Sequence, residues 1–194
     1  MKRVGIALGG PLRQDSRRTP NLLANSQMIR TRVATLDDVE SISALLMANA
    51  ADRGGMLLGD WSVRVVRDCL DAEQLIIVAT GETGLLGVLL TEDKARVSAP
   101  PVVAMFRAWP GSKDAYGYGP VCIDRAARGQ GVLDALYREL VRQRPDREAV
   151  LFIRADNPRS LSAHLRLGMR EVAGFVLDGE DFIVLSTRPE PSPD

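Results

Sequence analysis

Residues 121–133 read VCIDRAARGQGVL, and this stretch decides how the rest of the sequence is interpreted. Its apolar start predicts a short strand from Val121 to Asp124, and the apolar stripe after Gly131 predicts a helix. Between them, Gly129 and Gly131 allow backbone N–H groups to point outward with no Cβ in the way. The free N–H groups and the positive dipole end of the helix favour an anion, and Arg128 adds a charged donor. The segment therefore predicts a phosphate cradle, although an ordinary tight turn leaves the same pattern.

Strands and helices alternate around this segment. The expected elements upstream are a strand at 29–33, a helix from 35 to about 51, a helix capped by Asp60, an antiparallel hairpin of strands 75–79 and 85–90, and an insertion at 92–117 with one short helix. The expected elements downstream are a strand at 150–153, a short helix at 157–167, and a closing hairpin of strands 171–177 and 182–185. The pattern indicates one α/β domain.

A family resemblance becomes specific at two motifs. Residues 123–131, Ile-Asp-Arg-Ala-Ala-Arg-Gly-Gln-Gly, resemble the acetyl-CoA signature of the GNAT superfamily, in which hydrophobic-Asp-Pro precedes Arg-Gly-x-Gly-x-Gly/Ala. Residues 157–169 resemble a second element of that superfamily, Asn-x-x-Ala/Ser followed by an aromatic residue or His and then Leu-Gly-Phe. The resemblance implies an α/β (α+β) fold, with a mixed, mostly antiparallel central sheet of six to seven strands flanked by about four helices.

The resemblance also implies a site for acetyl-CoA as co-substrate, with no metal. Backbone groups of the strand would bind the pantetheine amides, at Val121, Cys122 and Ile123. The turn would hold the pyrophosphate, through Arg128, Gly129, Gln130, Gly131, Val132 and Leu133. Asn157 would contact the pantetheine arm, and it is equally a candidate N-cap before Pro158. Leu133 replaces the usual Gly or Ala, so its side chain must turn into the core or crowd the diphosphate.

His164 is the only histidine, and it lies where many members of the superfamily carry the tyrosine that protonates the departing thiolate. An acid is useful there because a thiol of pKa ~8.5 leaves better once its sulfur is protonated. A histidine that merely packs on a short helix is the alternative. Residues 92–118 offer several candidate bases for the acceptor amine, and the sequence assigns none of them: Glu92, Asp93, Asp114, Tyr116 and Tyr118. The large aromatic residues either line an acceptor site or, as is commoner, fill the core: Trp61, Phe106 and Trp109.

Composition restricts partners and location. Lys+Arg and Asp+Glu both total 25, so no net positive field favours nucleic acid. No apolar run approaches the ~18 residues that a membrane span needs. Cys69 and Cys122 are expected to be buried free thiols, which fits a reducing cytoplasm. We expect a flexible N-terminal extension at 1–27, one catalytic domain at 28–188 and a disordered tail at 189–194.

The predicted function is transfer of an acetyl group from acetyl-CoA to a primary amine of a small molecule or peptide, by direct attack on the thioester. The first alternative is a non-catalytic acyl-CoA-binding or regulatory module. The second is a nucleotide-phosphate binder that uses the glycine turn alone. Many members of the superfamily dimerise, so a homodimer is a candidate assembly.

Overall fold

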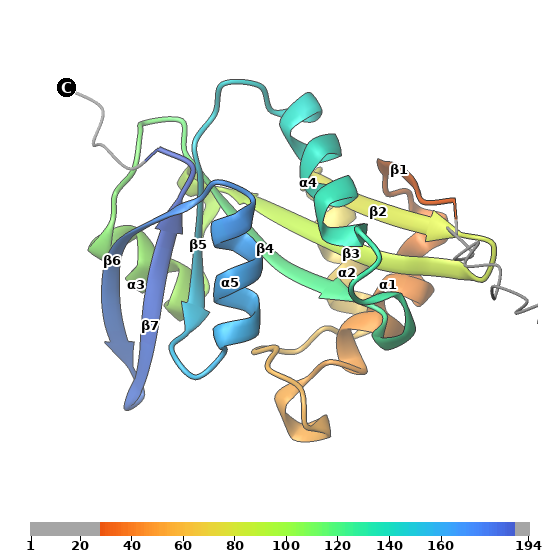
Figure 1. Ribbon diagram of the computed structural model, residues 1–194, viewed down its shortest axis with the longest axis horizontal. Coiled ribbons are helices and arrows are strands. Elements are labelled where there is room, and N and C mark those ends of the chain that lie inside the picture. Colours follow the sequence, from red (N-terminus) through yellow and green to blue (C-terminus); the bar gives the residue numbers. More distant parts are fainter. Residues whose placement is uncertain (1–27, 189–194) are drawn as a thin grey trace, which may run out of the picture.

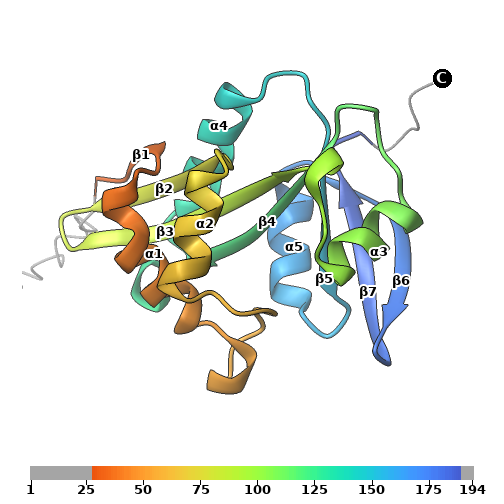
Figure 2. The ribbon, with the colours of Figure 1, turned by 180° about the vertical axis from the view of Figure 1, so that it is seen from behind.

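The structure, a computed structural model, describes residues 28–188, so the extension and tail expected at the two ends lie outside the described residues. It contains one seven-stranded sheet with helices on both faces (Figures 1 and 2). The strands, named in chain order, are β1 (Arg30–Val33), β2 (Ile76–Gly81), β3 (Gly84–Asp93), β4 (Tyr116–Ile123), β5 (Ala149–Arg154), β6 (Arg170–Leu177) and β7 (Glu180–Ser186). The α-helices are α1 (Val39–Met47), α2 (Val63–Asp71), α3 (Pro100–Ala108), α4 (Val132–Gln143) and α5 (Pro158–Arg166).

The sheet order is β1-β2-β3-β4-β5-β7-β6, and only β4 and β5 pair in parallel. The predicted α/β fold with a mostly antiparallel sheet is therefore confirmed. The two predicted hairpins are also present. In the second, Asp178 and Gly179 have φ of 52° and 81°, the left-handed conformation that a tight hairpin turn requires.

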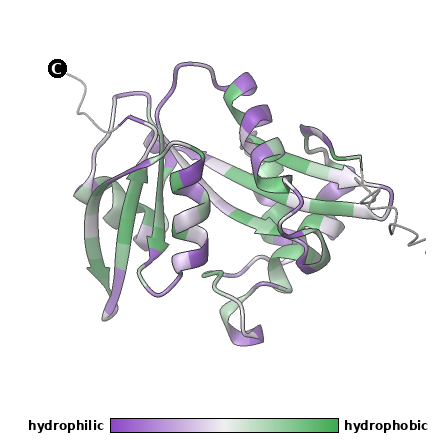
Figure 3. Ribbon diagram, in the orientation of Figure 1, coloured by the Kyte–Doolittle hydropathy of each residue, from purple (hydrophilic) through white to green (hydrophobic). Residues whose placement is uncertain are grey.

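Three apolar clusters hold the helices on the sheet. Helix α4 packs one face through Leu136 and Leu140, and α5 covers the same face further along. Helices α1, α2 and α3 cover the opposite face of the sheet (Figure 2). Helices α1 and α2 pack on the N-terminal strands, and α3 packs on the C-terminal strands. Figure 3 shows hydrophobic residues along the strands and hydrophilic residues in the connection between α4 and β5. The layers follow from burying one apolar stripe of each helix.

Strand β4 is longer than the sequence predicts, because it begins at Tyr116 instead of Val121. Gly117, Gly119 and Pro120 hide its first half, since these residue types are poor strand formers. The first helix is shorter than predicted and ends at Met47, with a separate 3₁₀ turn at Ala51–Arg53. The short helix expected in the 92–117 insertion exists as α3.

Strands β4 and β5 separate soon after they meet. Their parallel pairing comprises Tyr116 opposite Ala149 and Gly117 opposite Val150. Beyond Gly117, the only strand of the described range 28–188 that pairs with β4 is β3, on its other side. The β5 side of β4 is therefore open from Tyr118 onward, and we call this region the splay.

Candidate functional site

The backbone of β4 exposes hydrogen-bonding groups toward the splay. The Asp124 N–H donates to the Leu86 carbonyl at 2.8 Å, on the β3 side. Because successive residues of a strand direct their backbone groups to alternate sides, Val121 and Ile123 direct theirs away from β3. The Ile123 carbonyl agrees with this, since it accepts from Arg128 Nε at 3.3 Å. Cys122, also predicted to bind cofactor, instead pairs with Val88 of β3.

The glycine turn leads from β4 into α4. Asp124 Oδ1 accepts from the Ala126 N–H at 2.8 Å and fixes a 3₁₀ turn at Arg125–Ala127. Gly129 and Gly131 then have φ of 76° and 82°, where glycine is favoured. Gly131 is the N-cap of α4, and no side chain within residues 28–188 caps that helix. The first-turn N–H groups of α4 therefore have the geometry that an anion site requires.

The start of α4 is anchored by Val132, which is buried against β3. A Cβ at Gly87 would lie 2.9 Å from Val132 Cγ1, so glycine at this position lets the helix approach the strand. Leu133 is only half-buried, so its side chain does not turn fully into the core as those of Leu136 and Leu140 do. A leucine beside the cradle therefore remains a local departure from the family pattern.

Two polar side chains of the turn are held by the protein. Arg128 Nη2 donates to Asn49 Oδ1 at 2.7 Å, and Gln130 Nε2 donates to the Ala126 carbonyl at 2.7 Å. Both side chains are exposed, so a ligand can reach them. Asn49 follows α1, and sequence reasoning missed it because 79 residues separate it from Arg128.

Helix α5 carries the other two predicted residues. Asn157 is its N-cap, since its side-chain oxygen accepts from the Ser160 N–H at 3.1 Å. His164 is buried, with 5% of its surface exposed, and burial lowers its pKa. Its Nδ1 lies 2.8 Å from the Ser160 carbonyl, and its ring meets the edge of Tyr118 at 5.5 Å and 90°. The fold therefore brings His164 to β4 at the first residue of the splay.

The candidate bases differ sharply in environment. Asp93 is paired with Arg144 at 2.5 Å and Arg147 at 2.7 Å, and the bond to Arg144 is the main cause of its lowered pKa. Tyr116 lies beneath the same two guanidinium groups, and burial raises its pKa to about 12. Both groups are committed to this cluster, which makes them poor bases.

Glu92 has no such partners. Its carboxylate is half-buried, burial raises its pKa, and it makes no hydrogen bond or ion pair with any residue of 28–188. Strand alternation directs it to the face where Leu90 packs, the face of α1, α2 and α3. The charge of Glu92 also raises the pKa of Cys69 on α2, although burial is the larger cause.

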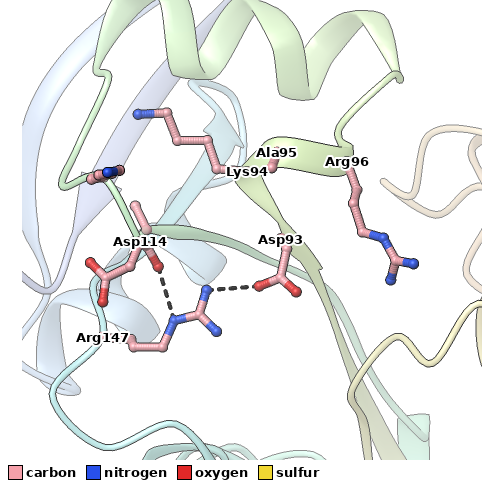
Figure 4. A pocket seen from close by; sticks show the side chains of 8 residues that line it. Asp93, Lys94, Ala95, Arg96, Asp114 and Arg147 are labelled. Carbon is pink, nitrogen blue, oxygen red and sulfur yellow. Dashed lines mark hydrogen bonds and ion pairs between the residues drawn. The ribbon is translucent and has the colours of Figure 1, made fainter.

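A cavity of about 340 Å³ lies beside the start of β4, at the opposite end of that strand from the glycine turn (Figure 4). In Figure 4 the Arg147 guanidinium bridges the Asp93 carboxylate and the Asp114 carbonyl. The cavity is lined by Asp93, Lys94, Ala95, Arg96, Lys113, Asp114, Ala115 and Arg147. It contains the exposed Asp114 and neither the splay nor the turn.

The remaining side chains singled out from the sequence are buried in the core or hydrogen-bonded within the protein. Cys122 is a buried free thiol whose pKa burial raises to about 12, so it is no nucleophile. Phe106, on α3, packs into the core between that helix and the sheet. Trp61 Nε1 donates to the Leu58 carbonyl at 2.8 Å, and Trp109 Nε1 donates to Glu148 Oε1 at 2.9 Å.

Glu148 is a buried carboxylate that sequence reasoning missed. It also accepts from the Ser112 N–H at 2.5 Å and from Ser186 Oγ at 2.6 Å. Bonds from these neutral donors, with the one from Trp109, outweigh burial and lower its pKa. The residue ties the loop before β4 to β5 and β7, and no sequence pattern marks it.

Within 28–188, no three His, Cys, Asp or Glu side chains are grouped as a metal site. No helix in the same range is both long and apolar enough to cross a bilayer.

No protein-family model matches the sequence, and no curated protein sequence matches it. Solved structures do. An N-acetyltransferase from Staphylococcus aureus Mu50 is 15% identical with a TM-score of 0.62, covering 84% of this chain and 99% of that one. The ribosomal-protein-S18-alanine N-acetyltransferase from Escherichia coli is 17% identical with a TM-score of 0.60, covering 82% and 92%. The protein yncA from Salmonella typhimurium, solved with its cofactor acetyl-CoA, is 16% identical with a TM-score of 0.60, covering 86% and 98%. At these identities the likeness establishes a shared fold.

Proposed function

We propose that the chain is a GNAT N-acetyltransferase whose catalytic domain spans residues 28–188, and that it moves the acetyl group of acetyl-CoA to a primary amine of a small molecule or peptide. The observation that carries the proposal is that two features follow each other along the chain. The open edge of β4 at Val121 and Ile123 leads, through the glycine turn, to the N-terminus of α4 at Gly131, which no side chain of residues 28–188 caps. The fold shared with N-acetyltransferases and the two sequence motifs support the same assignment.

Coenzyme A has matching chemistry. Its pantetheine arm carries amides that can pair with a strand edge, and its diphosphate is an anion suited to free helix N–H groups. In this proposal the arm lies along Val121 and Ile123, and the diphosphate lies at Gly129 and Gly131. The family resemblance implies that Asn157 contacts the arm, and Asn157 can do so while it caps α5.

The reaction needs one new bond and one broken bond. The neutral amine attacks the thioester carbonyl carbon, the C–N bond forms, and the C–S bond breaks with its electron pair leaving on sulfur. A backbone N–H of the β4 edge polarises the carbonyl. The amine loses a proton overall and the sulfur gains one, so a base and a route for that proton are required.

Glu92 is the base in this reaction. Its raised pKa and lack of partners suit proton abstraction, whereas Asp93 is held as an anion between two arginines. It faces the side of the sheet opposite α4 and α5, so the acceptor amine approaches from that side while acetyl-CoA lies on the other. His164 lies at the splay, where the thioester sulfur would be, and it is the candidate group at the leaving thiol.

The free cysteines support a cytoplasmic location as part of the proposal. Neutral overall charge gives no support for nucleic acid as a partner. A non-catalytic acyl-CoA-binding module is the second candidate, and the half-buried Leu133 beside the cradle favours it.

Calorimetry with acetyl-CoA and a thiol-release assay across an amine panel test the proposal together. We expect acetyl-CoA to bind and at least one amine to release free thiol. Glu92→Gln should bind acetyl-CoA normally and lose most turnover, while Glu82→Gln, in the exposed β2–β3 turn, is the matched control and should keep it. Binding without turnover on any amine indicates the binding module. If the protein binds ATP but does not bind coenzyme A, it is a nucleotide-phosphate binder.

A further inference from the structure

Two buried polar atoms at the splay have no hydrogen-bond partner among residues 28–188: the Tyr118 hydroxyl and His164 Nε2. Each residue exposes 5% of its surface, so bulk water does not satisfy them. A buried polar group left unpaired costs about 1–3 kcal/mol, and native proteins rarely tolerate it without a reason. Two such groups on touching rings point to a function at this position.

The chemistry of the pair is fixed by its surroundings. The Ser160 carbonyl can only accept a hydrogen bond, so His164 Nδ1, which lies 2.8 Å from it, carries the ring proton. Burial lowers the His164 pKa and keeps the ring neutral, which leaves Nε2 as a bare acceptor. Burial likewise raises the Tyr118 pKa and keeps its hydroxyl protonated as a donor. The pair therefore offers one donor and one acceptor.

The pair also lies between helices α4 and α5. Tyr118 is the first residue of β4 after the last pair with β5. Its ring meets Tyr137 of α4 at 6.3 Å and His164 of α5 at 5.5 Å. A ligand arm that follows the open edge of β4 from Ile123 toward Tyr116 reaches Tyr118 at its far end.

We propose that the Tyr118 hydroxyl and His164 Nε2 form a subsite for the terminal thiol of coenzyme A, in which Tyr118 donates to the sulfur and the thiol S–H donates to His164. A neutral thiol has one donor and weak acceptor capacity, and so it matches both protein groups. A thioester or a thiolate only accepts, and so it matches Tyr118 alone. The subsite therefore offers one more hydrogen bond to the product thiol than to the thioester.

This subsite changes the role expected of His164. The sequence predicts an acid that protonates the departing sulfur, whereas a neutral ring with a bare Nε2 has no proton to give there. Tyr118, on β4, is the group that can donate to the sulfur as charge develops on it. His164 orients the thiol after transfer.

The inference rests on the proposed function, and a comparison of two ligands tests it without knowledge of the acceptor. Calorimetry would compare coenzyme A with desulfo-coenzyme A, in which hydrogen replaces the thiol. We expect the wild type to bind coenzyme A about tenfold more tightly, because the hydrogen bonds to the thiol contribute roughly this much together, and we expect Tyr118→Phe to lower that ratio by removing one of the two bonds. Tyr137→Phe is the control, because Tyr137 is the other aromatic ring that contacts Tyr118, and this variant should keep the wild-type ratio.

A second variant, His164→Phe, tests the subsite if Tyr118→Phe does not fold. His164→Phe keeps a ring against Tyr118 but removes the acceptor, and it should also lower the ratio. If both compounds bind and the ratio is the same in wild type, Tyr118→Phe and His164→Phe, the pair does not hold the thiol and the inference is wrong. If neither compound binds the wild type, the proposed function fails and the subsite fails with it.

Discussion

Replacing Gly131 by alanine should separate the cost of backbone strain from the cost of a lost anion site. Gly131 has φ of 82°, and an added Cβ would meet no atom within 4 Å. The β6–β7 turn offers a matched control, because Gly179 has φ of 81° and is equally open. A non-glycine residue in this left-handed conformation costs about 1–2 kcal/mol. For a chain of this size, that corresponds to a fall in melting temperature of about 2–8 °C for each variant.

The two variants should differ in ligand binding. A methyl group on Gly131 lies on the open side of the turn, where the diphosphate would accept hydrogen bonds from the backbone. Losing one hydrogen bond to a charged group costs about 1.5–3 kcal/mol, or roughly 10–100-fold in affinity. Calorimetry with coenzyme A should therefore show this loss for Gly131→Ala and none for Gly179→Ala. Equal affinities in two variants with equal melting temperatures would refute the assignment of the turn as a diphosphate site.

Three further predictions follow from the pKa shifts. The single histidine gives one imidazole signal by NMR, and its titration midpoint should lie below 6.5 because His164 is buried; a midpoint at or above that value contradicts a neutral ring. Asp93→Asn should lower the melting temperature at pH 7. The Asp93 pKa is lower in the folded protein than its unfolded value of ~3.9, so the ion pairs stabilise the fold above that pH, and this stabilisation is lost as the pH falls through the folded pKa. The difference in melting temperature between variant and wild type should therefore shrink below about pH 4. A difference that does not depend on pH would count against the ion pairs. Cys122, whose pKa is raised to about 12, should not react with a thiol reagent in the native state, and rapid labelling of it would show that β4 opens.

Much of the fold was predictable because its signals are local. The two hairpins are marked by glycine at Gly81, Gly84 and Gly179, and the helices by their apolar stripes. The strand-turn-helix at residues 121–133 was also predictable, because its left-handed glycines and uncapped helix start are written in adjacent residues.

The missed features depend on contacts between distant segments. The first half of β4 reads as a loop, since Gly117, Gly119 and Pro120 are poor strand formers, and it becomes a strand through pairing with β3 and, at its start, with β5. Glu148 looks like a surface acid, yet it is buried and accepts hydrogen bonds from the loop before β4 and from β7. The pairing of Tyr118 with His164 joins β4 to α5 across the splay, and the chemical state of His164 depends on the Ser160 carbonyl.

The most direct test of coenzyme A binding at β4 and the glycine turn is an NMR titration of the backbone amides. Saturating coenzyme A should shift and protect from exchange the amides of Val121, Ile123, Gly129 and Gly131, and it should leave Gly179 in the β6–β7 turn unchanged. Saturation that leaves the β4 and turn amides where they are in the free protein would contradict the proposed site.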